Sequence, residues 1–176
     1  MASIGDSSLK LAYALALSDL IISPATPSNT ARGGGILYPI VRSLSSAFGS
    51  EPGETSRKIG SYLMKSSFQV NCITSAMFLT SVAPNSLVAA LALKTAGVNL
   101  SWCTWALAGI VPGMIALAVC PYVVYLMYPP EIKKTPEAKE IAKREIEKMG
   151  PMSAGEKVVA ITFVSALLLW SPASFT

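Results

Sequence analysis

A run of 36 residues without a charged side chain, Thr95–Pro130, constrains the fold more than any other feature. A helix crosses the hydrocarbon core of a bilayer, about 30 Å thick, with about 20 predominantly apolar residues. Two tryptophans lie near the start of the run and three tyrosines near its end, and such aromatic belts mark the two surfaces of a membrane. The run therefore predicts a transmembrane helix over residues 99–130.

Charged residues are scarce in the remainder of the chain as well. They make up 14% of the 176 residues, against about 25% in an ordinary soluble domain. Thirteen of the 24 lie between Glu131 and Lys157, which leaves 11 for the other 149 residues. A soluble globule of this size cannot cover its surface with so few charges, so the composition predicts an all-α integral membrane protein.

The side chains that most enzymes and metal sites use are absent or isolated. The sequence has no histidine, and Cys72, Cys103 and Cys120 stand alone in apolar stretches. Zinc sites need closely spaced Cys or His residues, so we expect no zinc and no histidine-based hydrolysis. The net charge of +4 forms no basic stripe, which argues against nucleic-acid binding. We expect neither an enzyme nor a nucleic-acid-binding protein.

Two short apolar segments flank a polar stretch near the start of the chain. Leu9–Ser23 and Ile36–Phe48 are each too short to cross a bilayer at about 1.5 Å per residue. Between them, Pro24–Gly35 contains two prolines and three consecutive glycines, which oppose a continuous helix. Residues 1–48 therefore predict a re-entrant helical hairpin. Its tip must be buried in protein or line a cavity, because non-helical backbone at membrane depth survives only there.

A second polar break interrupts the next apolar run. Ile59–Leu79 is long enough to cross the bilayer and carries one charge, Lys65. The stretch Thr80–Asn85 breaks this helix, and Ser86–Leu93 is apolar again. We therefore expect an interrupted transmembrane helix over residues 59–93.

The distribution of basic residues predicts the orientation. The loop 49–58 holds two Lys or Arg residues and the charged connector 131–157 holds seven, so the positive-inside rule places both in the cytoplasm. The middle of the connector, Pro136–Met149, has the composition of a surface helix, either interfacial or solvated. Residues 158–176 begin a further transmembrane helix that is too short to span, which indicates a piece of a longer protein.

Polar residues at the two breaks are candidates for binding. Ser28-Asn29-Thr30 precedes the second hairpin helix, and Thr80, Ser81 and Asn85 could face it from the other break. Helix ends at mid-membrane depth are typical of secondary transporters: a helix N-terminus suits a carboxylate, and unwound carbonyls and hydroxyls suit Na⁺. The alternative is that these residues serve only as N-caps.

Arg32 is the charged residue of the hairpin tip. An arginine inside a membrane is energetically costly and is a functional hypothesis by default. It could bind a substrate carboxylate through two hydrogen bonds, or supply the positive charge that a sodium ion supplies elsewhere. The alternative is a structural ion pair, with Asp19 as its partner.

These motifs resemble those of the divalent anion:sodium symporter family. They are most similar to the branch with bacterial citrate/succinate and tartrate/succinate exchangers and plastid 2-oxoglutarate/malate translocators. The resemblance covers nearly the whole chain and is carried by Pro27–Ile40, Arg57–Leu63, Ser75–Asn85, Tyr128–Lys133 and Lys148–Pro151. It implies the end of the first of two inverted repeats of an elevator-type, dimeric transporter, from the input hairpin through two further helices, plus the start of the second half.

The resemblance also implies roles for individual residues. It places substrate carboxylates at Ser28, Asn29 and Thr30, and we expect Arg32 and Asn85 to complete the substrate site. It places a cation, if one is bound, at Ser28, Asn29, Thr80, Ser81 and Ala83. The family's glycine- and proline-rich loop reads Ser81-Val-Ala-Pro-Asn85 here. This departure, together with Arg32, favours exchange over sodium coupling.

The function that we expect is secondary active transport of di- or tricarboxylates by anion exchange. The substrate class includes succinate, malate, 2-oxoglutarate, citrate and tartrate. Sodium-coupled symport and a non-transporting membrane remnant or subunit are the alternatives, and sodium is the one cofactor considered. Because no transit peptide precedes the hairpin, a multi-pass bacterial inner membrane protein is favoured over a plastid inner envelope protein.

Overall fold

The computed structural model describes residues 6–136, 147 and 150–170. In this part of the chain helices are joined by loops, and the β-type pairing is limited to an isolated antiparallel bridge between Ser7 and Lys134. Short 3-10 turns lie at Ser23–Ala25 (η1) and Leu79–Ser81 (η3), and a π-helix (η2) covers Ala31–Leu37. The α-helices are α1 (Ser8–Ile22), α2 (Tyr38–Ala47), α3 (Gly60–Met77), α4 (Ala83–Ala96), α5 (Trp102–Met127) and α7 (Ala154–Trp170).

The all-helical prediction is confirmed for the described residues. Within the described ranges two segments are long and apolar enough to cross a membrane, Ser8–Ala25 and Trp102–Met127. The first of these is longer than the predicted hairpin arm because the 3-10 turn η1 extends α1. The predicted helix over 99–130 corresponds to α5, and the predicted start of a helix at 158 corresponds to α7, which begins at Ala154.

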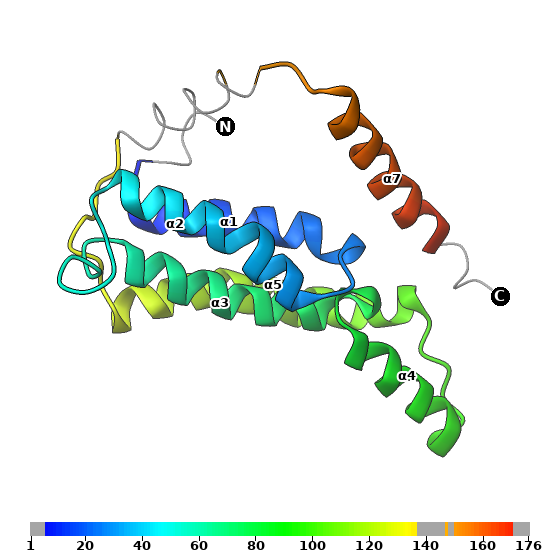
Figure 1. Ribbon diagram of the computed structural model, residues 1–176. Helices are drawn as coiled ribbons and strands as arrows, with labels where there is room; N and C mark the ends of the chain where they lie inside the picture. Colours follow the sequence, from blue (N-terminus) through cyan, green and yellow to red (C-terminus); the bar gives the residue numbers. More distant parts are fainter. Residues whose placement is uncertain (1–5, 137–146, 148–149, 171–176) are drawn as a thin grey trace.

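The first two helices form a hairpin. Figure 1 shows α1 running toward the tip and the joined η2 and α2 returning beside it. Only Thr26–Ser28 lies outside a helix at the tip, because the three glycines continue as the π-helix η2. The non-helical break is therefore shorter than the glycine content predicted. A Cβ at Gly33 would lie 3.3 Å from Oδ1 of Asn71, so glycine allows η2 to approach α3 closely.

The second predicted break follows the C-terminal end of α3. The α-helix ends at Met77, η3 follows, and α4 begins at Ala83 with Pro84 in its first turn. Proline suits this position because the first N–H groups of a helix have no partner within it. Helix α4 leaves the bundle at an angle (Figure 1) and contains no buried residue.

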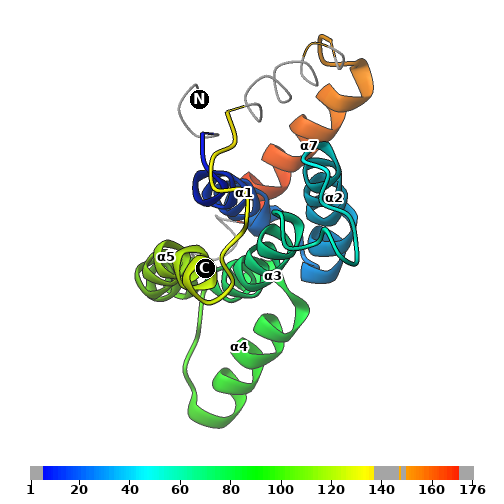
Figure 2. The ribbon, with the colours of Figure 1, turned by 90° about the vertical axis from the view of Figure 1, so that its left-hand side faces the viewer.

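Helix α3 is the centre of the bundle. In the view of Figure 2 it lies between α5 and the hairpin, and it contacts α1, α2 and α5. Helix α5 approaches it through Gly109 and Gly113, where a Cβ would lie 2.8 Å from the Met77 carbonyl oxygen and 2.5 Å from the Met77 Cγ. This small-xxx-small spacing is the usual device for close helix packing in membranes.

The apolar side chains divide between a core and an exposed surface. The core between the hairpin and α3 includes Leu15, Val41 and Leu63. Large apolar side chains along α5 are exposed, among them Leu107 at 73% and Val111 at 64%. Exposed apolar helices are expected in a bilayer, where lipid covers them.

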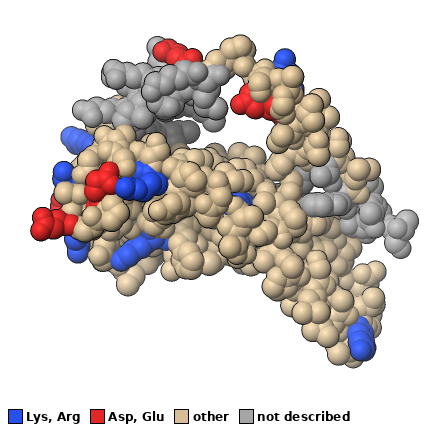
Figure 3. Space-filling model, viewed as in Figure 1, with Lys and Arg blue, Asp and Glu red and all other residues tan. Residues whose placement is uncertain are grey.

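Charged side chains of the described residues gather at one end of the bundle. Figure 3 shows them over the loop that joins α2 to α3, whereas the middle of the bundle is almost free of charge on this face. Of the predicted connector 131–157, residues 137–146 and 148–149 lie outside the described residues, and with them most of the predicted surface helix.

Candidate functional site

The hairpin tip and the α3–α4 break meet at the same end of the bundle. The hydroxyl of Ser23 donates to the carbonyl oxygen of Thr74 over 2.9 Å and lies 2.8 Å from the hydroxyl of Ser81. Ser81 in turn donates to the Ser23 carbonyl oxygen over 3.0 Å, and Thr80 donates to that of Pro24 over 2.6 Å. The two 3-10 turns η1 and η3 are therefore joined by direct hydrogen bonds.

Arg32 is the most enclosed charged residue at this junction. Its side chain is 0% exposed, and Nε donates to Oδ1 of Asp19 over 2.7 Å. Asp19 is equally buried, and its Oδ2 accepts a hydrogen bond from the Thr74 hydroxyl. A buried charge is tolerated when it is paired and its remaining hydrogen-bonding groups are satisfied, and this ion pair meets both conditions.

The other two guanidinium nitrogens bind both sides of the junction. Nη2 donates to the hydroxyls of Thr74 and Ser75, over 3.2 and 2.8 Å. Nη1 lies 3.3 Å from the Thr26 carbonyl oxygen and 3.5 Å from that of Ser81. Arg32 therefore connects both arms of the hairpin to α3 and to η3.

Arg32 thus forms the structural ion pair that the sequence analysis gave as the alternative to substrate binding. Asp19, named as its possible partner, is its partner, and all three guanidinium nitrogens have acceptors within the protein. Direct contact between Arg32 and a substrate carboxylate stays a prediction. Its Nη1 lies between the carbonyl oxygens of Thr26, at the hairpin tip, and Ser81, at the α3–α4 break. The positive charge of Arg32 therefore occupies a position where these oxygens could otherwise ligate a cation.

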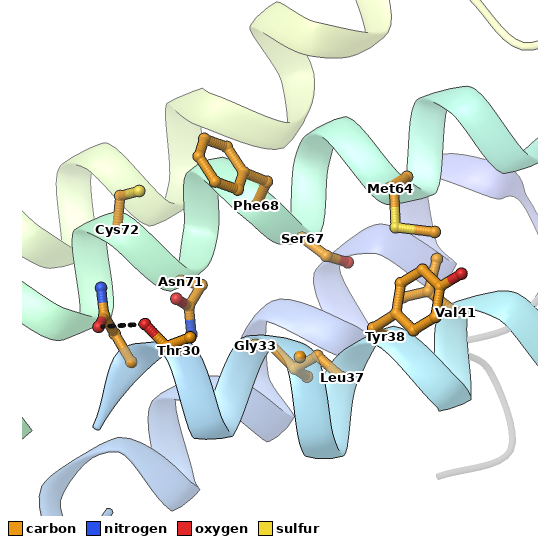
Figure 4. Close-up of a pocket in the computed structure, with 12 residues that line it drawn as sticks. Thr30, Gly33, Leu37, Tyr38, Val41, Met64, Ser67, Phe68, Asn71 and Cys72 are labelled. Atoms are coloured by element: carbon orange, nitrogen blue, oxygen red, sulfur yellow. Dashed lines mark hydrogen bonds between the residues drawn. The ribbon is translucent and has the colours of Figure 1, made fainter. Parts of the chain in front are cut away.

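The three tip residues differ in their surroundings. The Ser28 hydroxyl accepts a hydrogen bond from the Ala31 N–H over 3.2 Å, so Ser28 caps the second hairpin arm. Thr30 is exposed, and its hydroxyl donates to Oδ1 of Asn29 over 3.4 Å (Figure 4). Because the first N–H groups of a helix lack partners within it, Asn29 and Thr30 lie where an anion would be favoured.

A cavity of about 480 Å³ opens beside these residues. It lies between the η2–α2 arm and α3, and Figure 4 shows side chains from both elements around it. Most of its wall is apolar. Polar side chains come from Asn29 and Thr30 at the tip and from Ser67 and Asn71 on α3; the other lining residues are Gly33, Gly34, Leu37, Tyr38, Val41, Met64, Phe68 and Cys72.

Ser67 is a candidate that the sequence did not single out. It is 8% exposed, and its hydroxyl has no hydrogen-bond partner in the described part of the chain. A buried hydroxyl without a partner is costly, so a ligand or water in the cavity would stabilise it. The sequence does contain an indication of this residue. Ser67, Asn71 and Ser75 are spaced four residues apart, which places three polar side chains on one face of an apolar helix.

The residues predicted at the second break are engaged within the protein. The Asn85 amide donates to the carbonyl oxygens of Ser75 and Phe78, over 2.7 and 2.9 Å, and so satisfies carbonyls at the end of α3. Thr80 accepts a hydrogen bond from the Trp102 indole over 3.1 Å. Ala83 is exposed at the first position of α4. Ligand binding by these residues stays a prediction.

A comparison with known families decides the identity of the chain. The family model of the sodium:sulfate symporter transmembrane region matches residues 1–175. The chain belongs to this family. The predicted resemblance to anion:sodium symporters is thereby confirmed.

Individual relatives are similar over nearly the whole chain. YflS of Bacillus subtilis (strain 168), provisionally named a malate transporter, is 54% identical over 94% of this chain and 35% of its own length. Dicarboxylate transporter 1 from the chloroplast of Spinacia oleracea is 46% identical over 94% of this chain and 29% of its own. The L-tartrate/succinate antiporter of Escherichia coli (strain UTI89 / UPEC) is 40% identical over 95% of this chain and 34% of its own. The chain thus spans about a third of the length of these relatives.

Proposed function

We propose that the full-length protein containing this chain transports di- or tricarboxylates across a membrane by anion exchange. The observation that carries this proposal is the buried guanidinium of Arg32, held between the hairpin tip and the α3–α4 break. Relatives named as dicarboxylate transporters and as a tartrate/succinate antiporter support the substrate class.

The tip and the cavity supply the groups that a carboxylate needs. Asn29 and Thr30 offer side-chain donors at a helix N-terminus, where the partial positive charge favours anions. Ser67 lines the cavity, and its buried hydroxyl has no partner among the described residues. Among the described residues no Asp or Glu lines the cavity, so a substrate anion meets no like charge from them.

Arg32 supports exchange over sodium coupling. Its Nη1 already lies against carbonyl oxygens of Thr26 and Ser81, and a sodium ion at these oxygens would meet a positive charge at close range. A permanently bound cation also does not dissociate between transport cycles. Sodium-coupled symport remains the second candidate because the matching family is named for sodium:sulfate symport.

The full-length protein in liposomes provides the test. We expect uptake of labelled succinate or malate only when unlabelled dicarboxylate is present inside, with equal rates in sodium and potassium media. A sodium requirement without internal substrate would establish symport instead. Absence of uptake under every condition would reject transport, and competition by citrate, tartrate and 2-oxoglutarate would define the substrate.

A serine pair tests the assignment of the cavity. We expect Ser67→Ala to weaken apparent substrate affinity by about tenfold, the equivalent of one hydrogen bond. Ser66→Ala is the matched control, because Ser66 is an adjacent buried serine that does not line the cavity. Equal affinities of the two variants would remove the cavity from the substrate site.

We also propose a multi-pass location in a bacterial inner membrane and a homodimer of the full-length protein. The Escherichia coli (strain K12) relative named inner membrane protein YbhI, 47% identical over 95% of this chain, supports the location, and the chloroplast relatives support the plastid alternative. Membrane fractionation tests the location. Light scattering of the purified protein tests the dimer, and a monomeric mass would reject it.

A further inference from the structure

The end of the bundle opposite the hairpin tip is a fixed junction of three segments. The chain that follows α5 returns along the α2–α3 loop, where the Glu131 N–H donates to the Arg57 carbonyl oxygen over 3.2 Å and the Ile132 N–H to that of Lys58 over 2.9 Å. The Ser8 N–H donates to the Lys133 carbonyl oxygen over 3.2 Å. The start of α1, the loop and the end of α5 are therefore held together by backbone hydrogen bonds.

Tyr128 lies at this junction between two positive charges. The guanidinium carbon of Arg57 is 4.5 Å from the centre of its ring, and Nζ of Lys65 is 3.2 Å from the same centre. Cation–π contacts of this kind hold a cation over an aromatic face. Within the described ranges neither cation forms a salt bridge with a carboxylate.

A carboxylate of the same loop, that of Glu51, is bound to another cation. Glu51 forms a salt bridge with Arg42, and the hydrogen bond from Arg42 lowers the pKa of Glu51. The carboxylate therefore stays charged and bound to Arg42. Arg57 and Lys65 are both exposed, so two like charges lie close together with water or an external anion to compensate them.

An apolar groove begins beside these two cations. It lies between α3 and α5, has a volume of about 610 Å³, and is lined by Met64, Lys65, Phe68, Gln69, Val124, Met127 and Tyr128. Phe68 is 67% exposed and Met127 is 79% exposed. The groove is thus positively charged at one end and apolar along its length.

We propose that this groove binds an anionic phospholipid of the cytoplasmic leaflet. Its phosphodiester lies against Arg57 and Lys65, and an acyl chain follows Phe68 and Met127. Lys65 is five residues beyond Gly60, the start of α3, which is about 8 Å along the helix. This depth suits the boundary between headgroups and hydrocarbon, and basic pockets between helices at the cytoplasmic side are typical sites for anionic headgroups.

The apolar wall distinguishes a lipid from a free anion. Inorganic phosphate would satisfy the two cations but would leave Phe68 and Met127 uncovered. A neutral phospholipid would cover the apolar wall but would add its own positive charge beside Arg57 and Lys65. Only an anionic amphiphile matches both ends of the groove.

The test uses the purified full-length protein, depleted of lipid in detergent. We expect added phosphatidylglycerol to raise the melting temperature and to be retained in native mass spectra, whereas phosphatidylcholine and inorganic phosphate have little effect. The double variant Arg57→Gln/Lys65→Gln is expected to weaken phosphatidylglycerol binding by about fivefold for each lost cation. Phe68→Ser is also expected to weaken phosphatidylglycerol binding, because it removes an apolar side chain from the wall of the groove.

Two controls separate this site from general charge and folding effects. Lys94→Gln removes an exposed cation from the last turn of α4, the helix that leaves the bundle (Figure 1), and is expected to bind phosphatidylglycerol like the parent protein. Arg57→Lys/Lys65→Arg keeps the charges and is expected to keep binding even if the neutral double variant fails to fold. Equal stabilisation by phosphatidylcholine or by phosphate alone, or an equal loss in Lys94→Gln, would overturn the proposal.

Discussion

Arg32 and Asp19 show how one ion pair can organise a membrane-buried junction. Removal of one partner from a buried pair is far more destabilising than replacement of both, because the remaining charge is left without compensation. The pair lies among Thr74, Ser75 and the Ser81 carbonyl, so its loss would affect the hairpin and the α3–α4 break together.

We expect Asp19→Leu to lower the stability of the full-length protein by about 3–5 kcal/mol, since Arg32 stays buried and unpaired. The melting temperature in detergent measures this change. The double variant Asp19→Leu/Arg32→Met removes both charges and is expected to recover most of the stability without recovering exchange. A single variant as stable as the parent would show that the pair does not stabilise the junction.

The charged residues of this site could be predicted from the sequence, but their hydroxyl partners could not. Arg32 and Asp19 were identified because charges are rare in apolar segments. Thr74 and Ser75 were not identified, because a hydroxyl within a helix usually donates a hydrogen bond to the carbonyl oxygen of the preceding turn. Ser75 does so toward Asn71 over 2.6 Å while it also accepts from Arg32, and sequence alone does not reveal the second contact.

At the scale of elements, glycines decide how closely the helices approach. Gly109 faces the backbone of Met77, whereas Gly113 faces its flexible side chain. An added methyl group at position 109 would clash with the Met77 backbone, which cannot move aside. At position 113 it would meet the Met77 thioether, which can adopt another conformation. The two positions therefore respond differently to the same substitution.

We expect Gly109→Ala to lower the melting temperature more than Gly113→Ala does, because overpacking against rigid atoms costs about 1–3 kcal/mol. Met77→Ala is expected to rescue Gly113→Ala but not Gly109→Ala. Gly155→Ala in α7 is the control, since a Cβ there meets no atom within 4 Å. Equal effects at all three glycines would contradict close packing of α5 on α3.

The elements themselves could be predicted better than their ends. Apolar length and the positions of proline and glycine indicated the hairpin, the interrupted helix and α5. The sequence predicts the break after α3 at Thr80–Asn85, because Pro84 reads as part of a break, although proline also favours the first turn of a helix. The π-helix η2 could not be predicted, because three consecutive glycines oppose a continuous helix in the sequence and the structure nevertheless continues it through them.

On the scale of the whole molecule, the loops separate into two groups at opposite ends of the bundle. The loop 49–58 lies with the segment after α5, and the connection between α4 and α5 lies at the far end (Figure 1). The basic residues of the first group predict a cytoplasmic position. The charge distribution predicts that both of these loops lie on one side of the membrane, and the order of crossings stays a prediction.

Cysteine labelling of the full-length protein tests the orientation. Glu54→Cys and Val98→Cys are introduced after serine replaces the cysteines of this chain, and both positions are exposed. With a membrane-impermeant maleimide, we expect right-side-out vesicles to label position 98 and inside-out vesicles to label position 54. The opposite pattern would invert the orientation and place the lipid groove in the other leaflet. Labelling of both positions from one side would mean that α3 and α4 do not cross the membrane as one interrupted helix.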